Sequence, residues 1–529
     1  MKEFEKFVEN FVATYKPLYA EAAKAYYVAS ITGDDKDYEQ SAKLEVELTK
    51  ILADKDKFAE LKKAGADEAE FTLIEKRQYK DLYNSYLSHQ IDQDKLEAMI
   101  NLQTEIEKKF ATFRAKLKDK DLTDNEVEEI LERSTDAEEL KQVWLSSKEV
   151  GKTVASDVVR LVKLRNEAAR EVGFSNFHEM SLKLDEQDPL EIEKIFDELD
   201  QLTGSAFAEV KHGADQFLAD RLGITADDLM PWHYQNRFFQ EAPKIYPVNF
   251  DKYYGGKDPV ELTRRYFEGI SMPVDDILAR SDLYEKPGKN QHAYCMDVDR
   301  EGDIRVLCNV KSNLKWMDTM LHELGHAVYD KFADPTLPWL LRTAAHTFTT
   351  EAIAIFFGAL ASNADWLKAN LGISNEESNT IQDAATKQLR LEKLIFSRWS
   401  QVVYRFEKSM YEDPDQNLNQ LWWQLVEKYQ MVKRPEGRDE PDWASKIHLA
   451  TVPAYYHNYL LGTVLASQIK SFLLDKVHAP ASFTGSKEMG EWLISNIFSP
   501  GARYHWDDMI ERATGEKLTV KYFTDEFVG

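Results

Sequence analysis

The sequence predicts a mainly α-helical protein that carries one short β-hairpin. Apolar residues recur at helical spacing from the start of the chain, at Phe4, Phe7, Val8 and Phe11. Helix-start signals recur as well, including a capping box from Thr123 to Glu126 and an N-cap with a first-turn proline at Asp188-Pro189. Only residues 291–310 read as two strands around a glycine-containing turn.

Composition indicates a large globular protein. Of the 529 residues, 43% are hydrophobic and 12% are aromatic, which is enough apolar material for a substantial core. The formal net charge is −25, which disfavours nucleic acid as a partner because its phosphates would repel the chain. Met1 to Lys6 has no apolar signal-peptide core, and no run of about 18 apolar residues predicts a membrane segment. We expect a cytoplasmic protein as the chain is written, or a secreted or periplasmic one if a signal peptide was removed.

The first 230 residues predict one helix after another, without a glycine- or serine-rich linker. We expect the charged run 116–121 to form solvated helix faces and loops. A proline-marked break at 230–236 follows. Its polar and aromatic side chains could pack in the core or line a cleft.

The predicted hairpin leads into an amphipathic helix at 316–329. Cys295 and Cys308 fall roughly opposite each other in the predicted pairing. Two cysteines exclude a disulfide framework, and free thiols are expected in a cytoplasmic protein. Further helices are expected from 375 toward 410, around Trp422, and from 460 to 473.

The motif with the clearest chemistry is His322-Glu323-Leu324-Gly325-His326, the HExxH pattern. Residues i and i+4 share one face of a helix, so His322 and His326 would aim two imidazoles, which are good Zn²⁺ ligands, at one point. Glu323 is placed to take a proton from a zinc-activated water. A catalytic zinc needs a third protein ligand, and Glu351 from a second helix is the best candidate. These residues predict one Zn²⁺ per chain.

A chance match is the alternative explanation of the HExxH pattern. Its amphipathic setting, unbroken by proline, favours the metal site instead. By contrast, His178-Glu179 begins like the motif, but Leu182 stands where the second histidine would be. We expect an ordinary helix turn there.

The order of motifs around the metal helix resembles the angiotensin-converting-enzyme family of zinc peptidyl dipeptidases. The resemblance rests on segments 306–310, 322–326 and 337–342, with Glu351 after them, and on later motifs in the family's order. Those later motifs are Trp422-Trp423, Lys428-Tyr429-Gln430, Lys446 with His448, and Val452-Pro453 with the tyrosines that follow. Weaker similarity extends from Phe11 to the C-terminus. The resemblance implies one ellipsoidal helical peptidase domain, residues 1–529, split by a deep cleft into two subdomains with the hairpin beside the zinc helix.

The resemblance assigns roles in the catalytic step. His322, His326 and Glu351 match the family's zinc ligands, and Glu323 matches its general base and acid. His292-Ala293 matches a hairpin segment that lies along bound substrate, where strand-like pairing with an extended peptide would use the backbone.

The resemblance also assigns residues that would hold the far end of the substrate. Lys446 matches the lysine that binds the C-terminal carboxylate, and His448 with Tyr459 matches the pair that stabilises the oxyanion. Tyr456 matches a second carboxylate-binding tyrosine. Pro453 is two residues further from these tyrosines than in the family, so Tyr455 competes with Tyr456. The family's carboxylate-binding glutamine falls at Tyr234 or Gln235.

Several departures from the family pattern carry predictions. Val426 and Asn458 stand where chloride-dependent members have arginines, so the resemblance implies chloride-insensitive activity. Ile355 replaces a carboxylate that orients a zinc-bound histidine, so another acceptor must serve. Gln291 replaces a cysteine, so the family's disulfide to the position of Cys308 cannot form.

The function expected from the resemblance is the release of C-terminal dipeptides from oligopeptides by a zinc metallopeptidase. A zinc oligopeptidase or carboxypeptidase with another cutting unit is the first alternative, because the cutting unit depends on an anchor distance that sequence does not give. A catalytically silent binding protein on the same fold is the second. Oligopeptides are the expected partners, and neither nucleic acid nor a membrane segment is expected.

Overall fold

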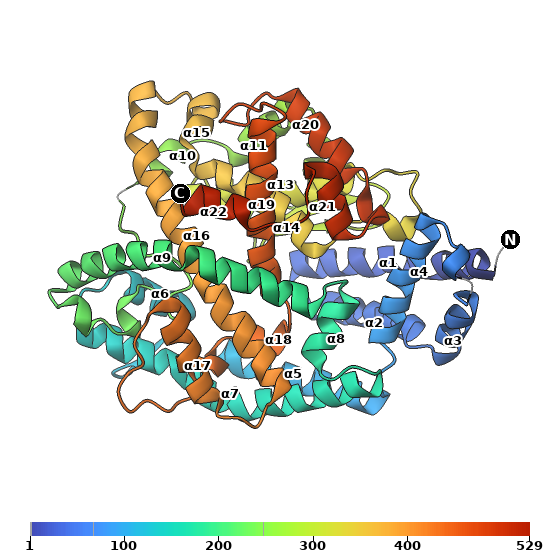
Figure 1. Cartoon of the computed structure of the whole chain (residues 1–529), viewed down its shortest axis with the longest axis horizontal. Helices are drawn as coiled ribbons and strands as arrows, with labels where there is room; N and C mark the ends of the chain where they lie inside the picture. The colour runs from blue at the N-terminus through green and yellow to red at the C-terminus, as the bar shows by residue number, and fades with distance from the viewer. Residues whose placement is uncertain (1–2, 67, 247) are drawn as a thin grey trace. The chain divides into compact units, whose positions relative to one another are not determined.

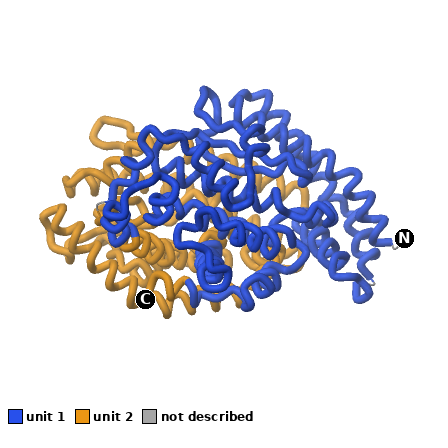
Figure 2. The backbone as a smooth tube through the Cα atoms, turned by 90° about the horizontal axis from the view of Figure 1, so that it is seen from above, with its two compact units in different colours: residues 1–90, 248–385, 461–522 blue, residues 91–247, 386–460, 523–529 orange. Residues whose placement is uncertain are grey.

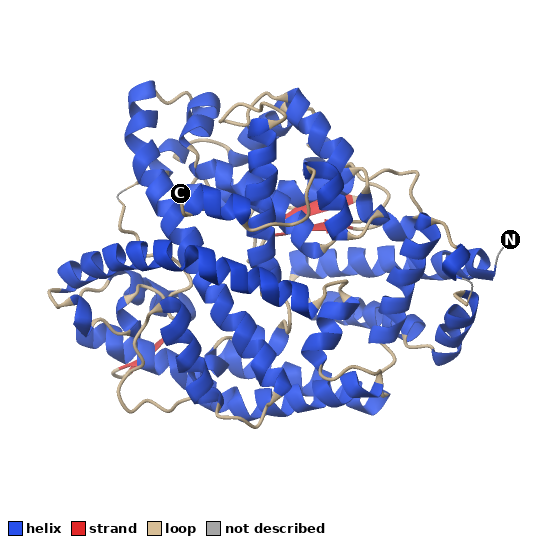
Figure 3. Cartoon of the chain, viewed as in Figure 1, coloured by secondary structure: helices blue, strands red, loops and turns tan. Residues whose placement is uncertain are grey.

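The computed structural model describes residues 3–66, 68–246 and 248–529. These residues form helices α1 to α22 and two two-stranded antiparallel sheets, so the predicted mainly α class is confirmed (Figures 1 and 3). No helix among them is both long enough and apolar enough to cross a membrane.

The chain divides into two compact units, coloured separately in Figure 2. Unit 1 comprises residues 1–90, 248–385 and 461–522, and unit 2 comprises residues 91–247, 386–460 and 523–529. The helices wholly within unit 1 are α1 (Glu3–Thr32), α2 (Asp35–Leu52), α3 (Lys55–Ala64), α4 (Leu73–Ser88), α10 (Asp251–Tyr254), α11 (Pro259–Gly269), α12 (Asp275–Arg280), α13 (Leu314–Lys331), α14 (Thr347–Gly358), α15 (Ala364–Leu371), α20 (Lys487–Leu493) and α21 (Trp506–Thr514). Those wholly within unit 2 are α5 (Gln93–Thr112), α6 (Asp124–Arg133), α7 (Ala137–Glu171), α8 (Phe177–Leu184), α9 (Pro189–Leu222), α17 (Leu418–Leu425) and α18 (His448–Thr451). Three helices begin in one unit and end in the other: α16 (Asn375–Glu412), α19 (His457–Asp475) and α22 (Lys521–Phe527).

In unit 1, the N-terminal helix forms because its apolar residues share one face. Phe4, Phe7 and Phe11 of α1 are buried in a cluster with Phe58 and Tyr86, as the helical spacing predicts. Deeper in the same unit, α13 and α14 pack closely, and these helices carry the HExxH motif and Glu351.

The predicted hairpin is present in unit 1 as β3 (Tyr294–Asp297) and β4 (Ile304–Leu307). Its register differs from the prediction, because Cys295 pairs with Val306 and not with Cys308. The turn explains the difference: Val298 donates its backbone N–H to Asp303, which fixes where the strands begin to pair. Both cysteines are free.

In unit 2, the predicted helix starts are confirmed. Thr123 and Glu126 form the capping box of α6, and the Asp188 carboxylate caps α9 ahead of Pro189. The charged run 116–121 is mostly solvated, as expected, but the expected helix faces and loops are wrong, because the run forms a small hairpin of β1 (Ala115–Leu117) and β2 (Lys120–Leu122). The polar residues of this run are exposed, so the sequence alone does not distinguish a strand from a loop. The backbone at Lys118 adopts a positive φ of 56°, and this turn allows β1 to pair with β2.

Candidate metal centre and substrate-binding residues

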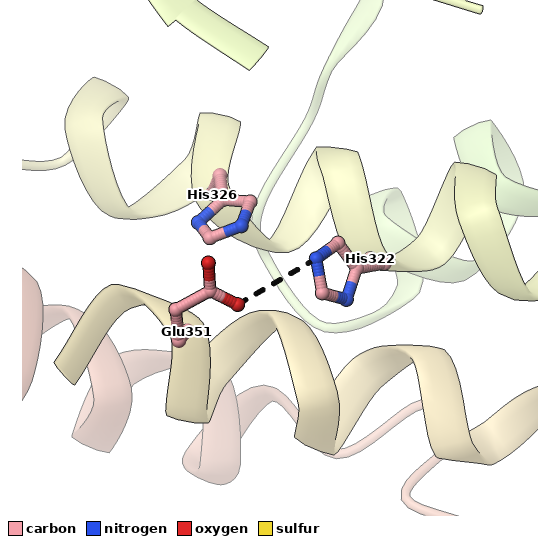
Figure 4. Close-up of side chains that lie close together, drawn as sticks. All are labelled: His322, His326 and Glu351. Carbon is pink, nitrogen blue, oxygen red and sulfur yellow. Dashed lines mark ion pairs between the residues drawn. The ribbon is translucent and has the colours of Figure 1, made fainter. Parts of the chain in front are cut away.

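The predicted metal ligands come together in unit 1. His322 and His326 lie one turn apart on α13, and Glu351 lies on the neighbouring helix α14 (Figure 4). One ligand atom from each of the three residues lies within 4.8 Å of the others, and His322 Nε2 is 3.9 Å from Glu351 Oε2. Two imidazole nitrogens and one carboxylate oxygen are the donor set of many catalytic zinc sites, so the residues fit this metal.

A glycine allows the two helices to approach. A Cβ atom built at Gly325, inside the HExxH motif, would lie 2.9 Å from the Cα atom of Ala354 on α14. Only a residue without a side chain fits this contact, which brings Glu351 within reach of the two histidines.

Thr350 supplies the acceptor that the sequence leaves open at Ile355. The hydroxyl oxygen of Thr350 is 2.7 Å from His326 Nδ1. If Nδ1 carries the proton, it donates to this hydroxyl and Nε2 keeps its lone pair for a metal. Sequence reasoning missed Thr350, although it directly precedes Glu351.

Glu323 is buried beside the metal ligands and is oriented by the hairpin. Its carboxylate accepts a hydrogen bond from the backbone N–H of Cys295 on β3. Burial raises the pKa of Glu323 to about 8, and repulsion from Glu351 adds to the effect. A carboxyl group with a raised pKa is a stronger proton acceptor once it is ionised.

The ligands themselves lie in a low-dielectric environment. Burial lowers the pKa of His326 to about 3, so its imidazole is neutral near pH 7, the form that binds metals. Burial also raises the pKa of Glu351 to about 7. A divalent cation at this position would favour the ionised carboxylate.

His292 and Ala293 precede β3. His292 is exposed, and its backbone N–H donates to Asn290 Oδ1 at 3.0 Å. Among the described residues, β3 pairs with β4 alone, so its other edge has no partner strand. At Cys295 this edge donates its backbone N–H to Glu323, and pairing of a peptide with His292 and Ala293 stays a prediction.

The residues predicted to bind the substrate's end gather in unit 2. Lys446 is buried, and its Nζ donates to Gln240 Oε1 at 2.7 Å. The same Nζ lies 5.2 Å from the ring centroid of Tyr456 and 5.4 Å from that of Trp399. Burial lowers the pKa of Lys446 to about 8, and the charge of Arg237 adds to the effect.

The tyrosines form a compact aromatic group next to His448. The Tyr456 ring lies 5.5 Å from that of His448 and 5.4 Å from that of Tyr459, and Tyr455 lies 5.3 Å from Tyr459. The ring of Tyr456 contacts the Lys446 ammonium group. This contact supports Tyr456 as the partner of Lys446, and Tyr455 stays the alternative.

The chain turns sharply just before these tyrosines. Ala454 has a positive φ of 54°, and its backbone N–H donates to the buried carboxylate of Glu407 at 2.8 Å.

His448 is kept neutral near pH 7, because burial lowers its pKa to about 4 and the charge of Lys446 adds to the effect.

Gln235 lies away from this group, although it was predicted to join it. Its amide donates to the carbonyl of Glu132 at 2.7 Å and accepts from the backbone N–H of Lys244. The other register candidate, Tyr234, is buried against Lys211 and Asp215. Gln240 is the glutamine next to Lys446.

A local turn explains the position of Gln240. Asn236 Oδ1 accepts hydrogen bonds from the backbone N–H groups of Phe238 and Gln240, and Gln235 and Phe239 adopt positive φ angles. Asparagine makes such turns, but their path is not readable from spacing.

The chain has relatives among known proteins. The sequence model of the peptidase family M2, described as "Angiotensin-converting enzyme", matches residues 1–233 and 252–525. The chain is similar to the angiotensin-converting enzyme of Haematobia irritans exigua, with 23% identity over 76% of this chain and 72% of that protein. It is also similar to the enzymes of Rattus norvegicus, at 25% identity over 73% of this chain, and of Bos taurus, at 24% over 73%. The match spans about a third of the length of these two mammalian relatives, 32% in each.

Proposed function

The chain belongs to the angiotensin-converting-enzyme family of peptidases, and we propose that it is a zinc peptidyl dipeptidase that releases C-terminal dipeptides from oligopeptides. The observation that carries the proposal is the convergence of His322, His326 and Glu351 with Glu323 buried beside them. This donor set leaves a catalytic zinc one position for a reacting group.

The metal and the general base divide the chemistry. A zinc ion held by His322, His326 and Glu351 would polarise the scissile carbonyl and acidify the attacking water. Glu323 takes the proton of that water and passes it to the leaving amine. Its hydrogen bond from the Cys295 N–H holds the carboxylate in one orientation for both transfers.

Unit 2 supplies the residues proposed to hold charge on the substrate. His448 and Tyr459 would donate hydrogen bonds to the oxyanion that develops on the scissile carbonyl. Lys446, assisted by Tyr456, would bind the C-terminal carboxylate, and the Gln240 contact supports this because it positions the ammonium group. A dipeptide is released if this anchor lies two residues beyond the scissile bond.

We also propose that residues 1–529 act as one catalytic domain. The metal ligands belong to unit 1, whereas Lys446 and His448 belong to unit 2. Each unit is assembled from three separate segments of the chain, so neither could be excised as a contiguous piece.

The test is a cleavage assay with a hexapeptide blocked at its N-terminus, followed by mass spectrometry. Loss of a C-terminal dipeptide is expected with zinc, and neither chelated protein nor Glu323→Gln should release it. Removal of a single residue, or internal cleavage, would retain a zinc peptidase but reject the dipeptide anchor. No cleavage by zinc-loaded protein would favour a silent binding protein.

Chloride is expected to have no effect on the activity. Val426 lines a small cavity of about 20 Å³ with Lys148, Trp423 and Asp442. The Asp442 carboxylate already accepts hydrogen bonds from Arg438, at 2.7 and 2.5 Å, and from Trp423 Nε1, at 3.2 Å. Arg237 also lines this cavity, so the prediction of chloride insensitivity rests on the absence of an arginine at position 426 and not on the charge of the lining.

The position of the second arginine is occupied by a neutral residue as well. Asn458 is buried, and its Oδ1 accepts from Gln187 Nε2 at 2.8 Å. We expect kcat/KM to change by less than about twofold when chloride is replaced by acetate at constant ionic strength. A larger stimulation by chloride would contradict this prediction.

A further inference from the structure

A cavity of about 450 Å³ in unit 2 lies against the predicted carboxylate anchor. Lys446 and His448 form part of its lining, and the phenyl rings of Phe110 and Phe113 form another part. Its volume lies within the range of pockets that hold small ligands, roughly 300 to 1,000 Å³.

The position of Lys446 indicates which substrate side chain would occupy this cavity. This step rests on the proposed function, in which Lys446 binds the C-terminal carboxylate of the substrate. The carboxylate carbon is bonded to the Cα atom of the C-terminal residue. The side chain of that residue therefore starts beside Lys446, at the wall of the cavity that would receive it.

The lining of this cavity contains more acidic than basic residues. Glu107, Asp124 and Glu128 contribute carboxylates, whereas Arg237 and Lys446 contribute cations. Arg237 is already paired, because its guanidinium donates to Glu128 at 2.5 Å and lies 3.3 Å from Asp124. A substrate carboxylate would neutralise Lys446.

Glu107 has no cationic partner among the residues that the structure describes. Its Oε1 accepts from the neutral amide of Gln103 at 3.0 Å. The residue is half-buried on α5, one turn from Phe110. A cationic side chain could pack its methylene groups on Phe110 and place its charge at Glu107.

A further acidic residue, Glu241, lies near Lys446. Glu241 accepts a hydrogen bond from Gln240, the residue that contacts Lys446. Desolvation raises the pKa of Glu241, and Glu128 raises it further by repulsion. Arg114 donates to the backbone carbonyl of Phe113, but it is exposed and its charge is screened.

We propose that this cavity makes the enzyme selective for peptides whose C-terminal residue is arginine or lysine. The charge of the side chain, and not its size, decides the preference. Citrulline has nearly the shape of arginine without its charge and is therefore the matched comparison.

Two measurements test the proposal. The first compares kcat/KM for blocked hexapeptides that differ only in ending with arginine, citrulline or glutamate. The second compares the Kd values of the dipeptides Ala-Arg and Ala-citrulline by calorimetry, which requires no cleavage. In both we expect about a fivefold preference for arginine over citrulline, the size of one partly solvated ion pair, with glutamate weakest.

The variant Glu107→Gln should reduce the preference for arginine to about twofold or less. Glu105→Gln is its matched control, because Glu105 lies on the same helix but its carboxylate pairs with Lys109 at 3.1 Å. The control should keep the fivefold preference. Thermal unfolding of both variants verifies that each is folded.

The outcomes separate this inference from the proposed function. Equal release of dipeptides from the arginine and citrulline peptides would overturn the inference and leave the proposed function intact. An equal loss of preference in Glu105→Gln would also overturn it. If no peptide were cleaved, the proposed function would fail, and equal Kd values for the two dipeptides would reject the cavity preference as well.

Discussion

At the scale of single residues, the hydroxyl of Thr350 orients one of the proposed zinc ligands. Valine has nearly the shape of threonine but cannot accept the hydrogen bond from His326 Nδ1, which is 2.7 Å away. We expect Thr350→Val to lower the zinc affinity about 10- to 100-fold, the usual effect of losing such a partner. Competition with a fluorescent chelator measures this affinity.

Thr319→Val is the control for this substitution. Thr319 lies on α13 as well, but it is half-buried, and its hydroxyl donates to the backbone carbonyl of Lys315. The zinc affinity of the Thr319→Val variant should equal that of the unmodified protein. Equal affinities in all three proteins would show that the Thr350 contact has no role in metal binding.

Lys446 should give the activity an alkaline limit. Burial holds the pKa of Lys446 at about 8, so its ammonium group loses its proton as the pH rises through this value. The free enzyme then lacks the charge proposed to bind the substrate's carboxylate. We expect KM to increase above pH 8, by up to about tenfold for each further pH unit.

Lys446→Arg tests the origin of this limit. A guanidinium group stays protonated throughout the accessible range, so the variant should show no increase of KM between pH 8 and 9.5. Initial rates across that range give KM and kcat separately. The same increase in Lys446→Arg, or none in the unmodified protein, would assign the limit to another group.

The residues of the candidate site differ in how far sequence could identify them. His322, His326 and Glu323 follow from helical periodicity alone, since a helix fixes the face on which they lie. Gln240 could not be identified, because the positive φ angles of Gln235 and Phe239 set the path of its loop. Such loops depend on tertiary contacts as well as on local spacing.

At the scale of elements, the packing of α13 on α14 determines whether the metal ligands meet. A Cβ atom at Gly325 would lie 2.9 Å from Ala354 Cα and 3.2 Å from a carbon of the Phe357 ring. Gly325→Ala should therefore push the helices apart and destabilise the protein by about 1–3 kcal/mol. It should also weaken zinc binding, because Glu351 moves with α14.

Gly213→Ala provides the comparison for a glycine inside a helix. A Cβ atom at Gly213 of α9 would meet nothing within 4 Å, so alanine should stabilise the protein by about 0.5–1 kcal/mol. Urea unfolding measures both variants. A stabilised Gly325→Ala would mean that the close approach of the two helices is not required.

The helices could be predicted from sequence because their signals are local. The caps at Thr123 and Asp188 and the apolar face of α1 each involve residues within a few turns. Strand pairing was less predictable. The register of β3 with β4 depends on the Asp303 turn, and the pairing of β1 with β2 is hidden in a charged run.

At the scale of the whole molecule, the two proposed parts of the site belong to different compact units. Unit 1 contains the three metal ligands and Glu323, and unit 2 contains Lys446 and His448. Metal binding and substrate binding should therefore respond to different substitutions. Sequence order alone could not predict this division, because each unit alternates along the chain.

Measurements of zinc content and thermal stability should distinguish the proposed roles of the two units. A ligand that binds only the folded state stabilises it by about 2.7 kcal/mol at 100 times its Kd, which raises Tm by a few degrees in a chain of this size. We expect His322→Ala to lose both the bound zinc and this increase of Tm. Lys446→Ala and His448→Ala should keep both, yet lose about 100-fold or more in kcat/KM. Elemental analysis and calorimetry of the same samples measure these properties, and loss of zinc in Lys446→Ala would reject the division of roles between the units.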